Sequence, residues 1–164
     1  MDHEASFQEL TKALAACPAV EALALGGSRA TGSHDAASDY DLYVYLAADL
    51  PVSRRQELYG YLFATMEWDN RYWETEDDGV FHDGVAVDIL FRTIDWLGQA
   101  VRHKLRDALA DTGYTTCLWH NLLHSRILFD RQGRLEALRA ECDVDYPRAL
   151  QAAMTIASAI KTGR

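Results

Sequence analysis

Residues 26–46 read GGSRATGSHDAASDYDLYVYL, a glycine-rich segment followed by an alternating apolar one. Its two leading glycines end the apolar run Val20–Leu25, and a serine and an arginine follow them. Two aspartates spaced one residue apart then begin a second apolar run. Glycines permit a tight turn whose backbone N–H groups can face an anion. The stretch therefore predicts a strand, an anion-facing turn and a second strand that begins with two carboxylates.

The second strand shows a period of two from Asp39 onward, which is typical of a β-strand. Alternate residues share a face, with Asp39, Asp41, Tyr43 and Tyr45 on one side and Tyr40, Leu42, Val44 and Leu46 on the other. Two carboxylates on the same side of a strand repel each other, and a bound divalent cation removes that repulsion. The pattern therefore indicates a site for a divalent cation.

A third carboxylate, Asp88, lies within the apolar stretch VAVDILF at residues 85–91, where an unpaired charge would cost several kcal/mol. Oxygen ligands of this kind suit Mg²⁺. Taken singly, Asp39 is explained as a strand cap and Asp88 as the partner of Arg92. The three aspartates together with the glycine–serine turn favour a metal site.

Gly27-Ser28, ten further residues and Asp39-Tyr40-Asp41 resemble the G-S-x10-D-x-D signature of the polymerase-β-type nucleotidyltransferase superfamily. The strand that carries Asp88 resembles the strand with that superfamily's third carboxylate. The resemblance covers residues 20–92, and the later helical part is more loosely similar to small bacterial nucleotidyltransferases. It implies two Mg²⁺ ions, for which Mn²⁺ can substitute, and an NTP donor, ATP being expected. It also implies transfer of a nucleoside monophosphate to a hydroxyl group with release of pyrophosphate.

The resemblance assigns a role to each residue of the signature. Gly27 and Ser28, with Arg29 beside them, are expected to bind the triphosphate of the donor. Asp39 and Asp41 would coordinate both metal ions. Asp88 would bind the second ion and help to deprotonate the acceptor hydroxyl. A P-loop is excluded because the lysine that this motif requires is absent after Gly32.

The whole-chain composition sets the background for this reading. The 164 residues are 49% hydrophobic, which is enough for one domain with a buried core. A formal net charge of −9 makes nucleic acid an unexpected partner. The N-terminus lacks the features of a signal peptide, and no apolar run is long enough to span a membrane. We therefore expect a soluble, cytoplasmic protein, and its three cysteines are expected to be reduced.

The expected fold class is α/β or α+β, with a mixed sheet flanked by helices and a helical C-terminal segment. We predict a catalytic core over residues 1–92 and a helical region over residues 93–164, which ends as a truncated chain would. Within the core, helices are expected at residues 5–16 and 51–66, a loop at 74–79, and a hairpin around the sequence HDG at 82–84. Further helices are expected at residues 94–110 and 116–129, after Gly133 and after Pro147.

Two functional classes remain open at this level. The first is an enzyme that adenylylates a small molecule or a protein. The second is a minimal nucleotidyltransferase that acts as an antitoxin and binds a helical toxin, a pairing that the family resemblance implies. An apolar stripe at Leu150, Met154, Ala157 and Ile160 needs covering by this chain, by a second copy or by such a partner. His120 and His124 have the spacing of zinc ligands but lack a third ligand, so they are expected to be a solvated or core-edge pair.

Overall fold

A computed structural model describes residues 2–32, 38–107 and 115–145 of the chain. Along the chain it contains α1 (His3–Ala16), β1 (Val20–Leu25), α2 (Gly27–Thr31), β2 (Tyr40–Leu46), α3 (Val52–Tyr59), the short 3₁₀ helix η1 (Gly60–Leu62), β3 (Phe63–Asn70), β4 (Thr75–Phe81), β5 (Ala86–Arg92), α4 (Ile94–Asp107), α5 (Thr115–His124), β6 (Arg126–Asp130) and α6 (Arg134–Cys142). None of the described helices is long and apolar enough to cross a bilayer.

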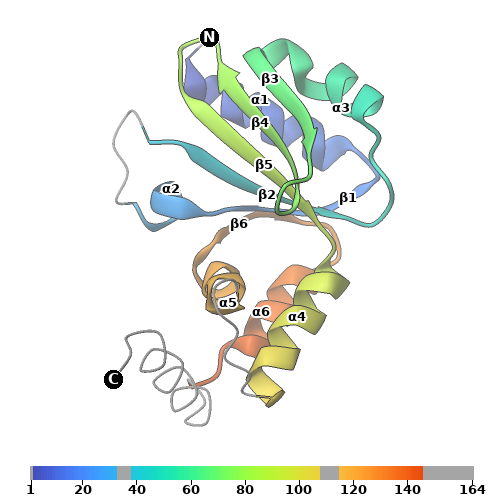
Figure 1. Ribbon diagram of the computed structural model, residues 1–164, viewed down its shortest axis with the longest axis vertical. Helices are drawn as coiled ribbons and strands as arrows, with labels where there is room; N and C mark the ends of the chain where they lie inside the picture. The colour runs from blue at the N-terminus through green and yellow to red at the C-terminus, as the bar shows by residue number, and fades with distance from the viewer. Residues whose placement is uncertain (1, 33–37, 108–114, 146–164) are drawn as a thin grey trace.

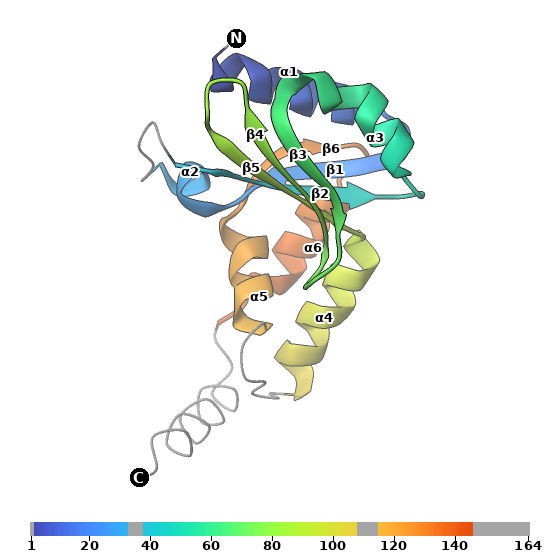
Figure 2. The ribbon, with the colours of Figure 1, turned by 45° about the horizontal axis from the view of Figure 1, so that its top comes forward.

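The six strands form one mixed sheet in the order β3-β4-β5-β2-β1-β6. β2 and β5 run parallel, whereas the other neighbouring pairs are antiparallel. Helices α1 and α3 cover one face of this sheet, and α4, α5 and α6 lie against the other (Figures 1 and 2). The predicted mixed sheet with flanking helices is confirmed.

Burial explains the sequence patterns of α1 and of the two inner strands. Asp2 caps α1 by accepting a hydrogen bond from the Ala5 N–H, and the helix buries Phe7, Leu10 and Leu14. β1 is buried along its whole length, because it lies between two strands and is covered on both faces. That position accounts for the apolar residues of the strand, and its one charged residue, Glu21, is buried and forms an ion pair with Arg134. The two predicted faces of β2 are confirmed. Tyr40, Leu42 and Val44 pack toward α1. Tyr43 and Tyr45 pack toward α4, α5 and α6.

The structure corrects two predictions for residues 51–79. The helix that follows Pro51 ends at Tyr59, and η1 then leads into β3, so that Met66 lies on a strand. The spacing of Leu58, Leu62 and Met66 therefore fits a helical period only by coincidence. The acidic segment at residues 74–79, predicted to be a loop, lies mainly in β4. A strand is possible there because the buried Asp77 is neutralised by a side chain from α3.

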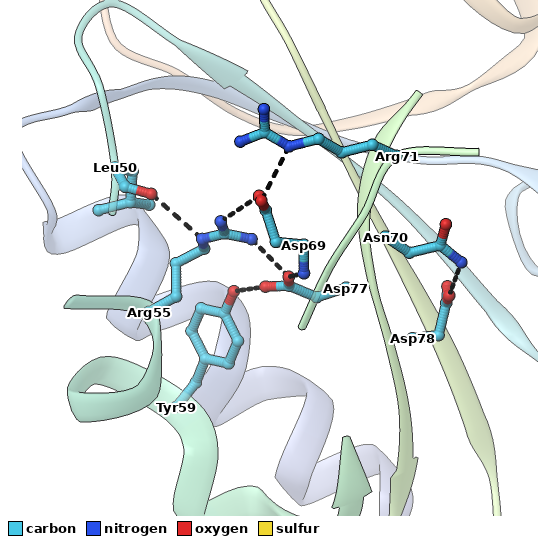
Figure 3. Close-up of polar contacts among 8 residues, drawn as sticks. All are labelled: Leu50, Arg55, Tyr59, Asp69, Asn70, Arg71, Asp77 and Asp78. Atoms are coloured by element: carbon cyan, nitrogen blue, oxygen red, sulfur yellow. Dashed lines mark hydrogen bonds and ion pairs between the residues drawn. The ribbon is translucent and has the colours of Figure 1, made fainter. Parts of the chain in front are cut away.

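That neutralising side chain is Arg55, which belongs to a buried polar network on the α3 side of the sheet (Figure 3). The Tyr59 hydroxyl donates to Asp77 at 2.6 Å, and the backbone N–H of Asp69 donates to the same carboxylate at 2.9 Å. Arg55 also pairs with Asp69 at 2.9 Å. The network joins α3 to β3 and β4, and it explains how a fully buried aspartate is tolerated.

The C-terminal region differs from the prediction in one element. The helix expected at residues 116–129 ends at His124 as α5, and β6 follows and pairs with β1 at the edge of the sheet. The helix after Gly133 is confirmed as α6, and the hairpin around Gly84 is confirmed between β4 and β5. The helix predicted after Pro147 and the apolar stripe at residues 150–160 lie outside the described residues.

Candidate active site

Two of the three predicted carboxylates are direct neighbours across the sheet. β2 and β5 run parallel with Asp41 paired to Asp88 in register. Tyr43 and Tyr45 share the face of Asp41 and pack into the cluster with α4, α5 and α6. On β5, Val87, Ile89 and Phe91 pack toward α1 and α3, so Asp88 lies on the opposite face. Asp41 and Asp88 therefore lie side by side on the same face of the sheet.

Asp39 precedes β2 and is exposed, two residues before Asp41 and thus on the same side of the chain. Burial raises the pKa of Asp41, and the charge of Asp39 raises it further. Burial also raises the pKa of Asp88 to about 6, with added repulsion from Asp78, Asp41 and Asp39. The three predicted carboxylates therefore act on one another electrostatically.

Arg92 does not neutralise Asp88, contrary to the alternative that the sequence leaves open. Its Nε and Nη2 donate to the two carboxylate oxygens of Glu74 at 2.6 and 2.7 Å, and its guanidinium lies over the Tyr43 ring. Among the described residues, no arginine, lysine or histidine forms an ion pair with Asp39, Asp41 or Asp88. The carboxylates thus leave an excess of negative charge at this edge of β2 and β5.

The glycine turn folds directly onto Asp41. The Gly26 N–H donates to the backbone carbonyl of Asp41 at 2.8 Å. Gly27 has φ +62°, and a Cβ at that position would lie 2.0 Å from Asp41 Oδ2. Only glycine fits there, because a side chain would be strained by the φ value and would collide with the carboxylate. The turn that begins α2, with Ser28 in its first residues, is therefore held against the carboxylates.

Arg29 lies apart from the other predicted residues. Its Nε donates to the carbonyl of Ser38 at 2.8 Å, and its guanidinium carbon lies 3.9 Å from the centroid of the Tyr40 ring. Tyr40 stacks on Phe7 of α1, with ring centroids 4.1 Å apart. Since Tyr40 and Asp41 are consecutive in a strand, their side chains lie on opposite faces. The structure therefore places the Arg29 guanidinium on the face away from the carboxylates.

A further carboxylate next to the site is missing from the sequence prediction. Asp78 on β4 is paired in antiparallel register with Asp88 on β5, and its side chain accepts a hydrogen bond from Asn70 Nδ2 at 3.1 Å (Figure 3). Glu76 is two residues away, and burial together with the charges of Asp78 and Asp88 raises its pKa. The sequence does contain a signal for Asp78 and Glu76. Glu74, Glu76 and Asp78 alternate, which in a strand places their carboxylates on one face.

The carboxylates fit a divalent cation in their chemistry. All three predicted ligands offer oxygen atoms, which Mg²⁺ prefers, and their mutual repulsion is what a cation would relieve. No group of three or more His, Cys, Asp or Glu side chains is close enough to hold a metal ion by itself, as far as the described ranges show. His120 and His124 lie on the exposed side of α5 and contact each other, with ring centroids 4.2 Å apart.

Comparisons with known proteins identify the family of the chain. A family model described as a nucleotidyltransferase domain matches residues 7–111. No curated protein matches the sequence. One similar solved structure is a toxin–antitoxin with AMP-PNP, with 18% identity, a TM-score of 0.48, and coverage of 97% of this chain and 98% of that one. Another is a mutant of the toxin–antitoxin MntA-HpeT, with 16% identity, a TM-score of 0.47 and the same coverage of both chains.

Proposed function

The chain belongs to the nucleotidyltransferase domain family, and on this premise we propose that it transfers AMP from ATP to a hydroxyl group with release of pyrophosphate, in a reaction that requires Mg²⁺. The observation that carries the proposal is the in-register pair Asp41–Asp88 beneath the glycine turn at Gly27. Neither a structural ion pair nor a strand cap accounts for carboxylates that repel one another.

The residues of the turn would bind the donor. Gly27 and Ser28 lie at the start of α2, where backbone N–H groups and the serine hydroxyl can donate to phosphate oxygens. The absence of a side chain at Gly27 keeps the turn close to Asp41, so that the bound phosphates would lie beside the carboxylates. Arg29 supports this role least, because its guanidinium is on the other face of the sheet.

Asp39, Asp41 and Asp88 are the residues that would hold Mg²⁺ or, in its place, Mn²⁺. When bound, the metal supplies charge neutralisation at the attacking and leaving oxygens of phosphoryl transfer. Asp88 has a second role in the proposal. In the metal-free site, burial and repulsion raise the pKa of the Asp88 carboxyl to about 6, so it is ionised at neutral pH and can accept a proton, whereas a bound cation would lower this pKa. Asp88 would therefore take the proton of the acceptor hydroxyl.

The acceptor is proposed only as a hydroxyl of a small molecule or a protein, and the reaction is proposed to take place in the cytoplasm. The antitoxin alternative, in which the chain binds a helical toxin, with or without modifying it, stays a prediction. The apolar stripe on which it depends lies outside the described residues. Transfer to a hydroxyl belongs to the enzyme and to an antitoxin that modifies its toxin, and the described site supports that chemistry.

The proposal is tested by following the two ends of ATP separately. ATP labelled at the α-phosphate is incubated with the protein, Mg²⁺ and a cell extract, and a parallel reaction contains ATP labelled at the γ-phosphate. We expect only the α-label to become covalently attached to an acceptor, while the γ-label appears in pyrophosphate. The Asp41→Asn variant should attach neither. Attachment of the γ-label, or α-labelling that is equal with and without the protein, would contradict the proposal.

A further inference from the structure

A cavity of about 1020 Å³ lies on the opposite face of the sheet from the carboxylates. It is bounded by α1, α2, β1 and β6, and Tyr40 forms part of its wall. Because Tyr40 and Asp41 point to opposite faces of β2, this cavity is separate from the candidate active site. Leu25, Leu128 and Phe129 give it apolar surface. Its size is that of a site for a small organic molecule.

The charged residues that line this cavity are mostly basic, whereas the whole chain is acidic. The protein carries a formal net charge of −9. The cavity, however, is lined by Lys12, Arg29 and Arg126, whereas Glu4 is its one lining carboxylate among the described residues. The His3 ring also lines the cavity and contacts Asp83 at 2.9 Å, so a second carboxylate lies beside the lining and is paired with that ring. A local excess of cations in an acidic protein favours an anionic occupant.

Arg29 adds an observation that points to a ligand. Its guanidinium is fixed by the hydrogen bond from Nε to the Ser38 carbonyl and by stacking over Tyr40. Its Nη2 is buried and has no hydrogen-bond partner among the described residues. Buried donors in native proteins are nearly always paired, with protein, water or a ligand. Because Arg29 also lines the cavity, a small shift of its guanidinium toward an anionic occupant would give this nitrogen an acceptor.

We propose that this cavity binds a small amphipathic organic anion. Its carboxylate, sulfonate or phosphate head group contacts Arg29, with Lys12 and Arg126 adding electrostatic attraction. Its apolar body lies against Leu25 and Leu128. The ligand needs both a charged head group and an apolar body, because the cavity has a charged side and apolar walls. Apolar surface with a few polar groups is typical of small-molecule sites.

Arg29 also connects this cavity to the candidate active site. It follows Ser28 in α2 and binds the carbonyl of Ser38, which precedes Asp39. A ligand that engages Arg29 therefore acts on both ends of the segment that carries Ser28 and Asp39. We expect occupancy of the cavity to change the affinity for nucleotide, and by linkage the nucleotide to change the affinity for the anion. This coupling rests on the proposed function, whereas binding to the cavity does not.

Binding is tested with anilinonaphthalene sulfonate, a fluorescent aromatic anion, and with N-phenylnaphthylamine, which has nearly the same rings but no charge. We expect saturable one-to-one binding of the sulfonate, at least about tenfold tighter than binding of the neutral probe. Arg29→Met and Arg126→Gln should each weaken sulfonate binding by about fivefold. Arg54→Gln is the control, since Arg54 is exposed on α3 and pairs with Glu57. Equal affinity for both probes, or unchanged binding by the Arg126 variant, would overturn the proposal even if Arg29→Met fails to fold.

The coupling is tested by titrating Mg²⁺–AMP-PNP into the protein with and without saturating anilinonaphthalene sulfonate. We expect the nucleotide affinity to differ by about fivefold or more between the two titrations. Equal affinities would refute the coupling and leave the anion site standing. Absence of nucleotide binding in both titrations would refute the proposed function instead. Asp88→Asn should bind the sulfonate as the wild type does, because its side chain lies on the other face.

Discussion

Asp41 and Asp88 face each other across parallel strands, paired in register on one side of the sheet, and no cation among the described residues neutralises either one. The protein thus holds two repelling carboxylates close together, with a third nearby at Asp39. Such an arrangement costs stability in the absence of a cation. This loss of stability is expected of a site whose residues serve to bind a cation and a phosphate donor, since functional sites commonly hold unfavourable arrangements.

The fit of Gly27 against Asp41 predicts a large effect from one added methyl group. Gly27→Ala would place its Cβ 2.0 Å from Asp41 Oδ2, so it should displace either the turn or the carboxylate and abolish most of the binding of Mg²⁺–AMP-PNP. Gly32→Ala is the matched control, because Gly32 also has a positive φ but has nothing within 4 Å of an added Cβ. Isothermal titration of both variants measures the difference. Equal affinities for nucleotide would show that closeness to Asp41 is unimportant.

The raised pKa of Asp88 predicts how the stability of the metal-free protein depends on pH. Between about pH 4 and 6 the folded state holds a proton on Asp88 that the unfolded state has lost, so stability falls as pH rises through this window. Asp88→Asn lacks this effect. In EDTA it should therefore be more stable than the wild type at about pH 7, by on the order of 1 kcal/mol after allowance for solvent screening.

Urea denaturation at several pH values measures this difference. The advantage of Asp88→Asn should shrink as the pH falls from about 7 to 4, because the wild-type carboxyl becomes protonated in the folded state. Asp49→Asn is the control, as Asp49 is exposed in the loop after β2. An advantage that does not depend on pH would show that the repulsion at Asp88 is absent.

Much of the site could be predicted because its sequence signals are local. The alternation from Asp39 to Leu46 predicts that Asp39 and Asp41 lie on the same side of the chain, and in the structure Asp41 lies in β2 with Asp39 just before it. The pairing of Asp41 with Asp88 is different, because it depends on β2 and β5 being parallel neighbours although β3 and β4 lie between them in the sequence. That order is set by the packing of the whole sheet.

The secondary-structure predictions that were wrong concern segments whose structure depends on tertiary contacts rather than on the local sequence pattern. Residues 74–79 look like a solvated loop until Arg55 supplies the charge that lets Asp77 be buried in β4. Residues after His124 continue an apolar pattern that suits a helix, yet they pair with β1 as an edge strand. The prediction that Arg29 binds the triphosphate is a different case: it stays a prediction, and the structure shows only that the guanidinium stacks on Tyr40, on the face away from the carboxylates. None of these partners is visible from neighbouring residues.

The buried network around Asp77 predicts a strong effect on stability. Asp77→Asn removes the buried carboxylate partner of Arg55 and leaves only its pairing with Asp69, so it should lower the free energy of unfolding by about 1.5–3 kcal/mol. The exposed ion pair Arg54–Glu57 gives a matched control, and Glu57→Gln should cost less than about 1 kcal/mol. Urea denaturation compares the two. A cost for Asp77→Asn as small as that of the control would refute the role of the network.

The proposed metal and nucleotide site predicts stabilisation by its ligands. Mg²⁺ or Mn²⁺ with AMP-PNP at about 100 times its dissociation constant should raise the melting temperature by about 5 °C or more, because the ligands bind only the folded state. Asp41→Asn should lose most of this shift, and Asp49→Asn should keep it. Thermal denaturation followed by circular dichroism gives both values. A full shift in Asp41→Asn would remove that residue from the site.

The most direct test of the central claim separates nucleotide binding from turnover in Asp88→Asn. Asp39 and Asp41 remain in this variant, so it should still bind Mg²⁺–ATP measurably. Its single-turnover rate with an acceptor should fall by at least about 10²-fold, because the group proposed to take the proton is lost. The melting temperature, the nucleotide affinity and the rate are measured on one preparation. A folded Asp88→Asn protein that binds Mg²⁺–ATP and turns over at a near-normal rate would contradict the account.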